Sequence, residues 1–136
     1  MKIDHEYLKQ LLTACQATDR PTFNIEDLNA EGIDYANPAF EFHMAILVDK
    51  GFIERENGDA GFGLFKGIDG FCSWSVLPLR LTASGHDFID TIQNPEVWSM
   101  TKTAIKTVGN VGLDIFVQIA KAEAKRFAVE KLGLSL

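Results

Sequence analysis

The chain has 136 residues, of which 46% are hydrophobic, and a net charge of -6. This length supports one hydrophobic core, so we expect one domain with appendages rather than two ordinary domains. No run of about 18 apolar residues occurs, and the first ten residues, MKIDHEYLKQ, are charged. These features exclude a membrane span and a signal peptide, and they predict a cytoplasmic protein without a membrane partner.

The charge is unevenly distributed along the chain. Residues 1–95 carry a balance of -8, whereas residues 96–136 carry +2. Because a basic surface normally supplies most of the affinity for nucleic acid, this distribution argues against a general electrostatic grip on DNA. Any attraction to phosphate would come from the tail or from a local patch.

The sequence of the first third of the chain predicts three helices. Asp4 is a helix cap, and apolar residues recur at helical spacing up to about residue 17. Residues 22–25 are expected to be extended, and residues 25–30 to form a short helix closed by a glycine. Asn37 followed by Pro38 marks the start of a third helix that ends at Lys50.

The middle of the chain predicts strands and turns. Residues 52–56 are typical of a strand, and Asn57-Gly58 supplies a turn. Glycines alternate with Phe62, Leu64 and Phe65 over residues 59–70, which indicates a long hairpin tip or a mobile loop. Residues 73–81 are predicted to form the returning strand, in which Pro78 implies an edge or a bulge. We expect the hairpin aromatics to pack on their own domain.

The remaining sequence predicts helices. Thr82 caps a fourth helix, and Asn94-Pro95 ends it and opens a fifth that runs to about residue 108. A glycine-containing joint then precedes a last helix over residues 113–132. The order predicts a mostly helical α+β protein: a winged helix-turn-helix core over residues 1–94, with a hairpin wing. Residues 95–136 would form a helical extension that packs on this core or makes a dimer interface.

Two segments extend this prediction, FHMAILVDKGFIE at 42–54 and LRLTASGHDFIDTIQNPEVW at 79–98. They resemble the paired signatures of an uncharacterised bacterial and phage-borne family, the domain of unknown function numbered two thousand five hundred and thirteen. The most distinctive part joins Leu81-Thr82, Gly85-His86, Phe88, Asp90 and Val97-Trp98. Similarity is expected to continue to residues 131–134. The resemblance implies a winged-helix fold and residence in phage or mobile-element genomes, and no known activity. The longer glycine- and aromatic-rich hairpin departs from the family's common form.

The third helix is the element that would read a DNA groove. A helical wheel places Phe40, Met44, Leu47 and Val48 toward the core. It places Ala39, Phe42, Ala45, Ile46 and Asp49 on another face, with His43 and Lys50 between the two faces. Base reading needs Arg, Lys, Asn or Gln, so this apolar face is a poor reader. It could be buried within the chain, contact a protein, or meet DNA through shape and backbone. His43 could contact phosphate or form a half-buried hydrogen bond.

We therefore carry two hypotheses for function. In the first, a dimeric winged-helix DNA-binding or regulatory protein of phage or mobile-element type contacts double-stranded DNA. In the second, a protein-interaction module on the same scaffold uses the Phe42 and Ile46 face or the hairpin aromatics. The candidate DNA- or partner-binding residues are Phe42, His43, Ile46, Arg55, Lys66 and Arg80.

No constellation for catalysis is found. Cys15 and Cys72 form neither a disulfide framework nor a CxxC pair, and are expected to be reduced. The three histidines lie on three different predicted helices, without ligand spacing for a metal. The hairpin glycines lack the Gly-Lys-Ser/Thr of a phosphate loop. We expect no enzyme, no cofactor and no metal.

The last helix is apolar on nearly all sides up to residue 120 and amphipathic afterwards. Such a segment must be buried, either against other helices of the same chain or in a dimer. A basic amphipathic helix can also lie on a membrane, but Glu123 and Glu130 weaken that option. A homodimer through this helix is the expected assembly.

Overall fold

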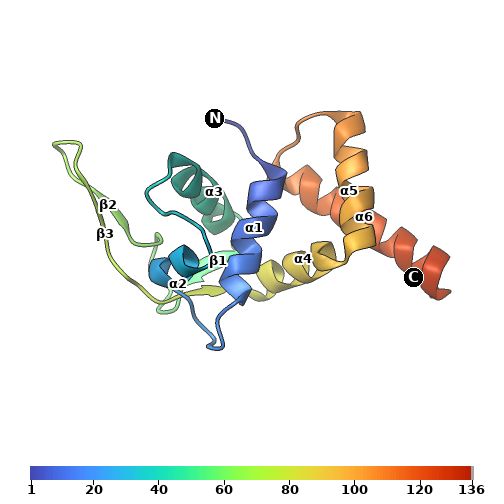
Figure 1. The fold of residues 1–136 in the computed structure, drawn as a ribbon, viewed down its shortest axis with the longest axis horizontal. Helices are drawn as coiled ribbons and strands as arrows, with labels where there is room; N and C mark the ends of the chain where they lie inside the picture. The colour runs from blue at the N-terminus through green and yellow to red at the C-terminus, as the bar shows by residue number, and fades with distance from the viewer. Residues whose placement is uncertain (136) are drawn as a thin grey trace. The chain divides into compact units, whose positions relative to one another are not determined.

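The computed structural model describes residues 1–135, which form six α-helices and four short β-strands (Figure 1). The helices are α1 (His5–Gln16), α2 (Ile25–Ala30), α3 (Pro38–Asp49), α4 (Ala83–Gln93), α5 (Pro95–Val108) and α6 (Leu113–Leu132). The strands are β1 (Ile53–Arg55), β2 (Leu64–Lys66), β3 (Cys72–Trp74) and β4 (Leu79–Leu81). The predicted mostly helical α+β class is confirmed. None of the helices among residues 1–135 has the length and apolar character needed to cross a membrane.

The chain divides into two compact units. Unit 1 contains residues 1–9 and the chain from Asp87 onward, and unit 2 contains residues 10–86. Helices α1 and α4 each contribute residues to both units. The N-terminal residues therefore belong to the same unit as α5 and α6.

Asparagine caps define where three helices begin. Asn24 accepts hydrogen bonds from the backbone N–H groups of Glu26 and Asp27, and the Asp27 carboxylate accepts one from the Asn24 N–H. Asn37 accepts a hydrogen bond from the Ala39 N–H at the start of α3, Asn94 accepts bonds from the Glu96 and Val97 N–H groups at the start of α5, and a proline follows each of them. These caps satisfy N–H groups that have no partner in the first helical turn. The predicted starts of all three helices are confirmed.

Unit 2 contains a short antiparallel ladder. Strands β1 and β4 pair with Ile53 opposite Leu81, and an isolated bridge joins Phe23 to Leu79. This bridge adds a third extended segment to the ladder, at the place where residues 22–25 were predicted to be extended. The core of this unit includes Leu11, Leu12, Cys15, Phe23, Ile25, Leu28, Phe40, Met44, Leu47, Ile53, Leu79 and Leu81.

The predicted single strand over residues 73–81 is wrong. Strand β3 pairs with β2, whereas β4 pairs with β1, and the chain leaves both ladders over residues 75–78. Pro78 has no N–H to donate to a ladder. Its carbonyl accepts a hydrogen bond from Glu56, while the Ser75 N–H donates to Gly63. The segment 59–70 is accordingly not all tip or loop, because it contains β2.

Gly85 allows the start of α4 to lie against the turn between α3 and β1. A Cβ atom at this position would fall far inside van der Waals contact with the carbonyl oxygen of Phe52. Thr82 reinforces the same joint, since its hydroxyl donates to the Gly51 carbonyl and accepts from the Gly85 N–H. The predicted Thr82 cap is confirmed.

Unit 1 is organised around Phe116 of α6. Its ring packs edge-on against Phe88 at 5.1 Å and His5 at 4.7 Å, and lies 6.0 Å from Trp98. His5 Nε2 also hydrogen bonds to the Val111 carbonyl at 2.9 Å. One face of the first half of α6, formed by Leu113, Phe116 and Ala120, is therefore buried, in agreement with the alternative of packing within the chain, whereas Ile115 is exposed.

We predict that Gly85→Ala destabilises the protein by about 2 kcal/mol, because the added methyl group forces a backbone shift in a packed joint. Gly112→Ala is the matched control, since a Cβ there meets nothing within 4 Å and φ is -72°. Chemical denaturation should place the control within about 1 kcal/mol of the wild type. If Gly85→Ala and Gly112→Ala have the same free energy of unfolding, the close approach at Gly85 does not restrict the residue at this position.

Candidate functional site

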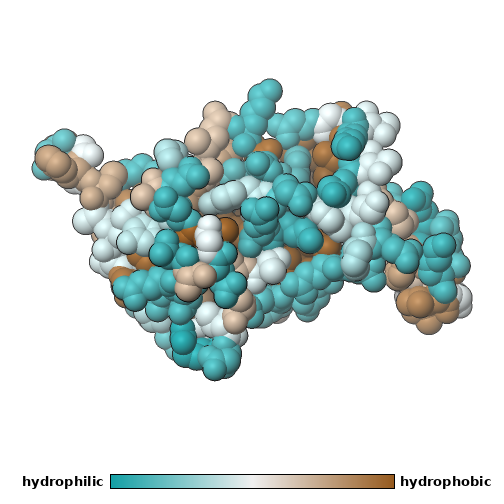
Figure 2. All heavy atoms as spheres, viewed as in Figure 1, coloured by the Kyte–Doolittle hydropathy of each residue, from teal (hydrophilic) through white to brown (hydrophobic). Residues whose placement is uncertain are grey.

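The hairpin β2–β3 carries an apolar outer surface in unit 2. Ile68 is fully exposed, Phe71 is 77% exposed and Phe65 is 50% exposed, and Val76 near the base is also exposed. The hairpin extends away from α2 and α3 (Figure 1), and apolar atoms appear along it in the space-filling view (Figure 2). Large apolar side chains grouped in this way on a surface typically mark a binding site. We name Phe65, Ile68, Phe71 and Val76 the hairpin patch.

An aromatic cluster holds the base of the hairpin on α3. The Trp74 ring lies 5.7 Å from Phe40, 6.1 Å from Phe62 and 5.3 Å from Tyr35. Phe40 is fully buried at the start of α3. Aromatic pairs at such distances add packing energy beyond simple burial. The cluster therefore anchors one side of the hairpin.

The strand register explains why some hairpin aromatics pack and others do not. Leu64 lies opposite Trp74, and Phe65 lies opposite Ser73. Successive side chains in a strand point to opposite faces. Leu64 and Trp74 thus share the anchored face, and Phe65 lies on the other one. The expectation that the hairpin aromatics pack on their own domain holds for Phe62 and Trp74, and it is wrong for Phe65 and Phe71.

Helix α3 does not present an open apolar face. Phe42 and Ile46 are half-buried, and Asp49 is exposed. His43 is only 2% exposed, and its Nδ1–H donates to the Ala39 carbonyl at 2.7 Å. This backbone bond within the helix matches the hydrogen-bonding alternative, and burial keeps the imidazole away from a phosphate.

Carboxylates pair with the three cations singled out in the sequence. Lys66 forms an ion pair with Glu41 of α3, and this contact raises the pKa of Lys66. The guanidinium of Arg80 lies 2.6 Å from Glu54, and that of Arg55 lies 3.9 Å from Asp59. Since each cation already has an acidic partner, the three do not form an unpaired basic patch.

The composition of unit 2 extends this observation. Residues 10–86 contain five Lys and Arg against eleven Asp and Glu, a balance of -6, and residues outside this range balance to zero. Arg20 is also paired, at 2.6 Å from Asp27. The unit with the predicted reading helix is therefore the acidic one.

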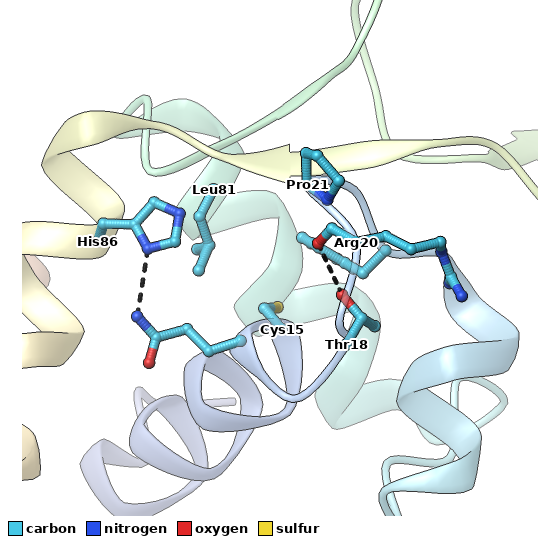
Figure 3. A pocket seen from close by; sticks show the side chains of 8 residues that line it. Cys15, Thr18, Arg20, Pro21, Leu81 and His86 are labelled. Carbon is cyan, nitrogen blue, oxygen red and sulfur yellow. Dashed lines mark hydrogen bonds between the residues drawn. The ribbon is translucent and has the colours of Figure 1, made fainter.

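A small pocket of about 260 Å³ opens in unit 2 beside Cys15 (Figure 3). Gln16 Nε2 donates to His86 Nδ1 at 3.2 Å, and the Thr18 hydroxyl bonds to backbone carbonyls. Burial raises the pKa of the Cys15 thiol, which keeps it protonated and unreactive. The histidine lone pair at Nδ1 is occupied and the thiol is inert, so this pocket offers no activated nucleophile.

The described part of the chain, residues 1–135, holds no group of three or more His, Cys, Asp or Glu side chains that could bind a metal ion. The second sequence hypothesis named the hairpin aromatics as a partner surface, but it did not identify the full hairpin patch. Ile68 and Val76 were not singled out, and the register that turns Phe65 outward depends on a turn at residues 67–70. The signal was present in the glycines flanking Ile68, which close a hairpin with Phe65 and Phe71 on either side of it.

Comparison with known proteins gives one result. A family model described as hypothetical protein (DUF2513) matches residues 2–111. The match ends before α6, so the continuation expected through residues 131–134 is not part of it. No curated protein and no solved structure matches the chain. Because the family model covers more than half of its residues, the chain belongs to the DUF2513 family.

Proposed function

We propose that this protein is a protein-interaction module that binds a partner through the hairpin patch. The exposed side chains of Phe65, Ile68 and Phe71 on one hairpin are the observation that carries the proposal. Burying aromatic and aliphatic groups of this size against a partner supplies the binding energy typical of interface hot spots.

The anchoring of the hairpin supports the same function. Trp74 fixes its inner face on Phe40, and Lys66 pairs with Glu41 of α3. A patch held in place before binding loses less conformational freedom when the partner arrives. Aromatic anchors on a fixed hairpin are therefore suited to specific recognition.

The acidic character of unit 2 favours protein over DNA as the partner. Phosphate binding needs cations that can replace counterions, and Arg55, Lys66 and Arg80 each already have a carboxylate partner. An interaction through apolar side chains does not need this charge. The proposal involves binding and no catalysis.

We expect Phe65→Ser with Phe71→Ser to lower partner recovery more than about tenfold, because exposed aromatic hot spots contribute about 2 kcal/mol or more each. The tagged variant and wild type would be expressed in the source cells, and crosslinked proteins quantified by mass spectrometry. Val108→Ser with Ile115→Ser is the control, since both residues are exposed and lie in unit 1. A protein recovered equally with the wild type, the hairpin variant and the control variant is not a partner of the patch. The proposal is contradicted if no protein is recovered less with the hairpin variant than with the other two.

DNA binding is the second candidate, favoured by the order of elements in unit 2. A short helix, helix α3, strand β1, a hairpin and strand β4 follow one another, and Phe23 bridges to Leu79. This order is typical of a winged helix, in which α3 and the hairpin would contact the duplex. A regulatory protein of phage or mobile-element type would fit this reading.

A binding assay with duplex DNA distinguishes the two proposed functions. With the interaction module we expect no shift in fluorescence anisotropy of a labelled mixed-sequence duplex at micromolar protein. DNA binding would instead give affinity that falls steeply with salt, and Lys66→Gln with Arg80→Gln would reduce that salt dependence. Such a result would replace the first candidate with the second.

We also propose a homodimer through the C-terminal half of α6. Val129 and Leu132 are exposed there and Leu134 is exposed just beyond the helix, and apolar atoms gather at this end (Figure 2). Such residues gain free energy when a second copy covers them. Helix α6 lies beyond the residues matched by the family model.

The molar mass measured by light scattering during size-exclusion chromatography tests the dimer. We expect the wild type to have twice the monomer mass, and Val129→Asp with Leu132→Asp to have the monomer mass, because two buried charges oppose association. Val108→Asp, an exposed position on α5, should remain dimeric. Most stable dimers have dissociation constants well below about 100 µM. A wild type that remains monomeric at that protein concentration therefore excludes this assembly.

A further inference from the structure

Unit 1 contains a groove that the hairpin patch does not use. Its volume is about 520 Å³, and it lies between residues 2–6 and helix α5. Ile3, Trp98 and Ile105 give it apolar walls. Trp98 is only 6% exposed, and Lys9 Nζ lies 5.3 Å from the centre of its ring. The volume falls within the range of about 300 to 1,000 Å³ typical of small-molecule sites.

Three lysines line the groove. Lys102 and Lys106 are one helical turn apart on α5, and Lys2 faces them from the N-terminal segment. Lys102 Nζ lies 5.6 Å from the centre of the Trp98 ring. Within residues 1–135, no carboxylate is ion-paired with Lys2, Lys102 or Lys106. These cations differ in this respect from Lys66 and Arg80 of unit 2.

Two carboxylates also line the groove. Asp4 is committed to helix α1, because its Oδ1 accepts the Tyr7 N–H at 3.0 Å. Glu6 is exposed in the first turn of the same helix. With three lysines against these two acids, one of which caps a helix, the balance of charge on the walls favours an anion.

We propose that this groove binds a small amphipathic carboxylate. The apolar body of the ligand would lie on Trp98 and Ile105, and its carboxylate would accept hydrogen bonds from Lys102 and Lys106. Ammonium–carboxylate hydrogen bonds are stronger than neutral ones, and a neighbouring apolar wall strengthens them further. The observation that carries this inference is an apolar recess rimmed by lysines that lack carboxylate partners. It is independent of the hairpin patch.

Trp98 provides a direct reporter of binding. The second tryptophan, Trp74, lies in the hairpin cluster, and Trp74→Phe leaves Trp98 as the sole tryptophan. We would titrate this variant with dodecanoate below its micelle concentration, and follow the Trp98 emission. Dodecanol carries the same chain without charge, and acetate carries the charge without the chain. We expect saturable binding of one dodecanoate per chain, with no comparable response to dodecanol or acetate.

Charge variants then test the lysines. Lys102→Gln with Lys106→Gln should weaken dodecanoate binding by about tenfold or more, because each loses a charge-assisted hydrogen bond. Lys121→Gln with Lys125→Gln is the matched control, since both residues are exposed and one turn apart on α6. Circular dichroism and thermal unfolding verify that the variants remain folded.

Three results would overturn the proposal. An equal response to dodecanol shows adsorption of the chain alone, and equal weakening by the α6 control shows a general charge effect. Saturation by an acidic peptide containing Asp-Phe, without saturation by dodecanoate, would assign the groove to a protein segment instead. None of these results bears on the hairpin patch, which is tested by Phe65→Ser and Phe71→Ser.

Discussion

Packing of Trp74 against Phe40 is the interaction on which the proposed functional surface depends. Phe40 is fully buried at the start of α3, so it offers a fixed point to which the hairpin attaches. Strand alternation then determines which side chains remain outside. Phe65 and Phe71 are exposed because the opposite face of the same hairpin is occupied by Leu64 and Trp74. One anchored face thus produces one apolar face that is open to a partner.

The two units differ in net charge as well as in packing. Unit 2 is strongly acidic, and the cations Arg20, Arg55, Lys66 and Arg80 are each paired with a carboxylate there. Such pairs contribute little stability at an exposed surface, but they neutralise charges that a phosphate would otherwise meet. Unit 1 has a net charge of zero, and in the described part of the chain its Lys2, Lys102 and Lys106 have no ion-paired carboxylate. The two proposed sites, apolar in unit 2 and anion-binding in unit 1, are consistent with this difference in charge.

The residues matched by the family model include both proposed binding sites but not the C-terminal helix. The family match covers residues 2–111, which include the hairpin patch and every residue lining the lysine groove. It brings no activity with it, so both binding proposals come from the site itself. The exposed end of α6 lies outside the match. A dimer formed there would be a property of this chain's own C-terminal helix.

Local signals in the sequence determined the helices. Asn37 with Pro38, Asn94 with Pro95, and Thr82 with Gly85 each mark a boundary, because capping and close approach involve residues only a few positions apart. The family resemblance over residues 42–54 and 79–98 was likewise readable. Tertiary structure decided the strand partners, the ion pairs and the outward position of Phe65, since these depend on residues far apart in the chain. Residues 73–81 show the difference: their composition is that of one strand, but pairing with β2 and β1 in turn divides them around Pro78.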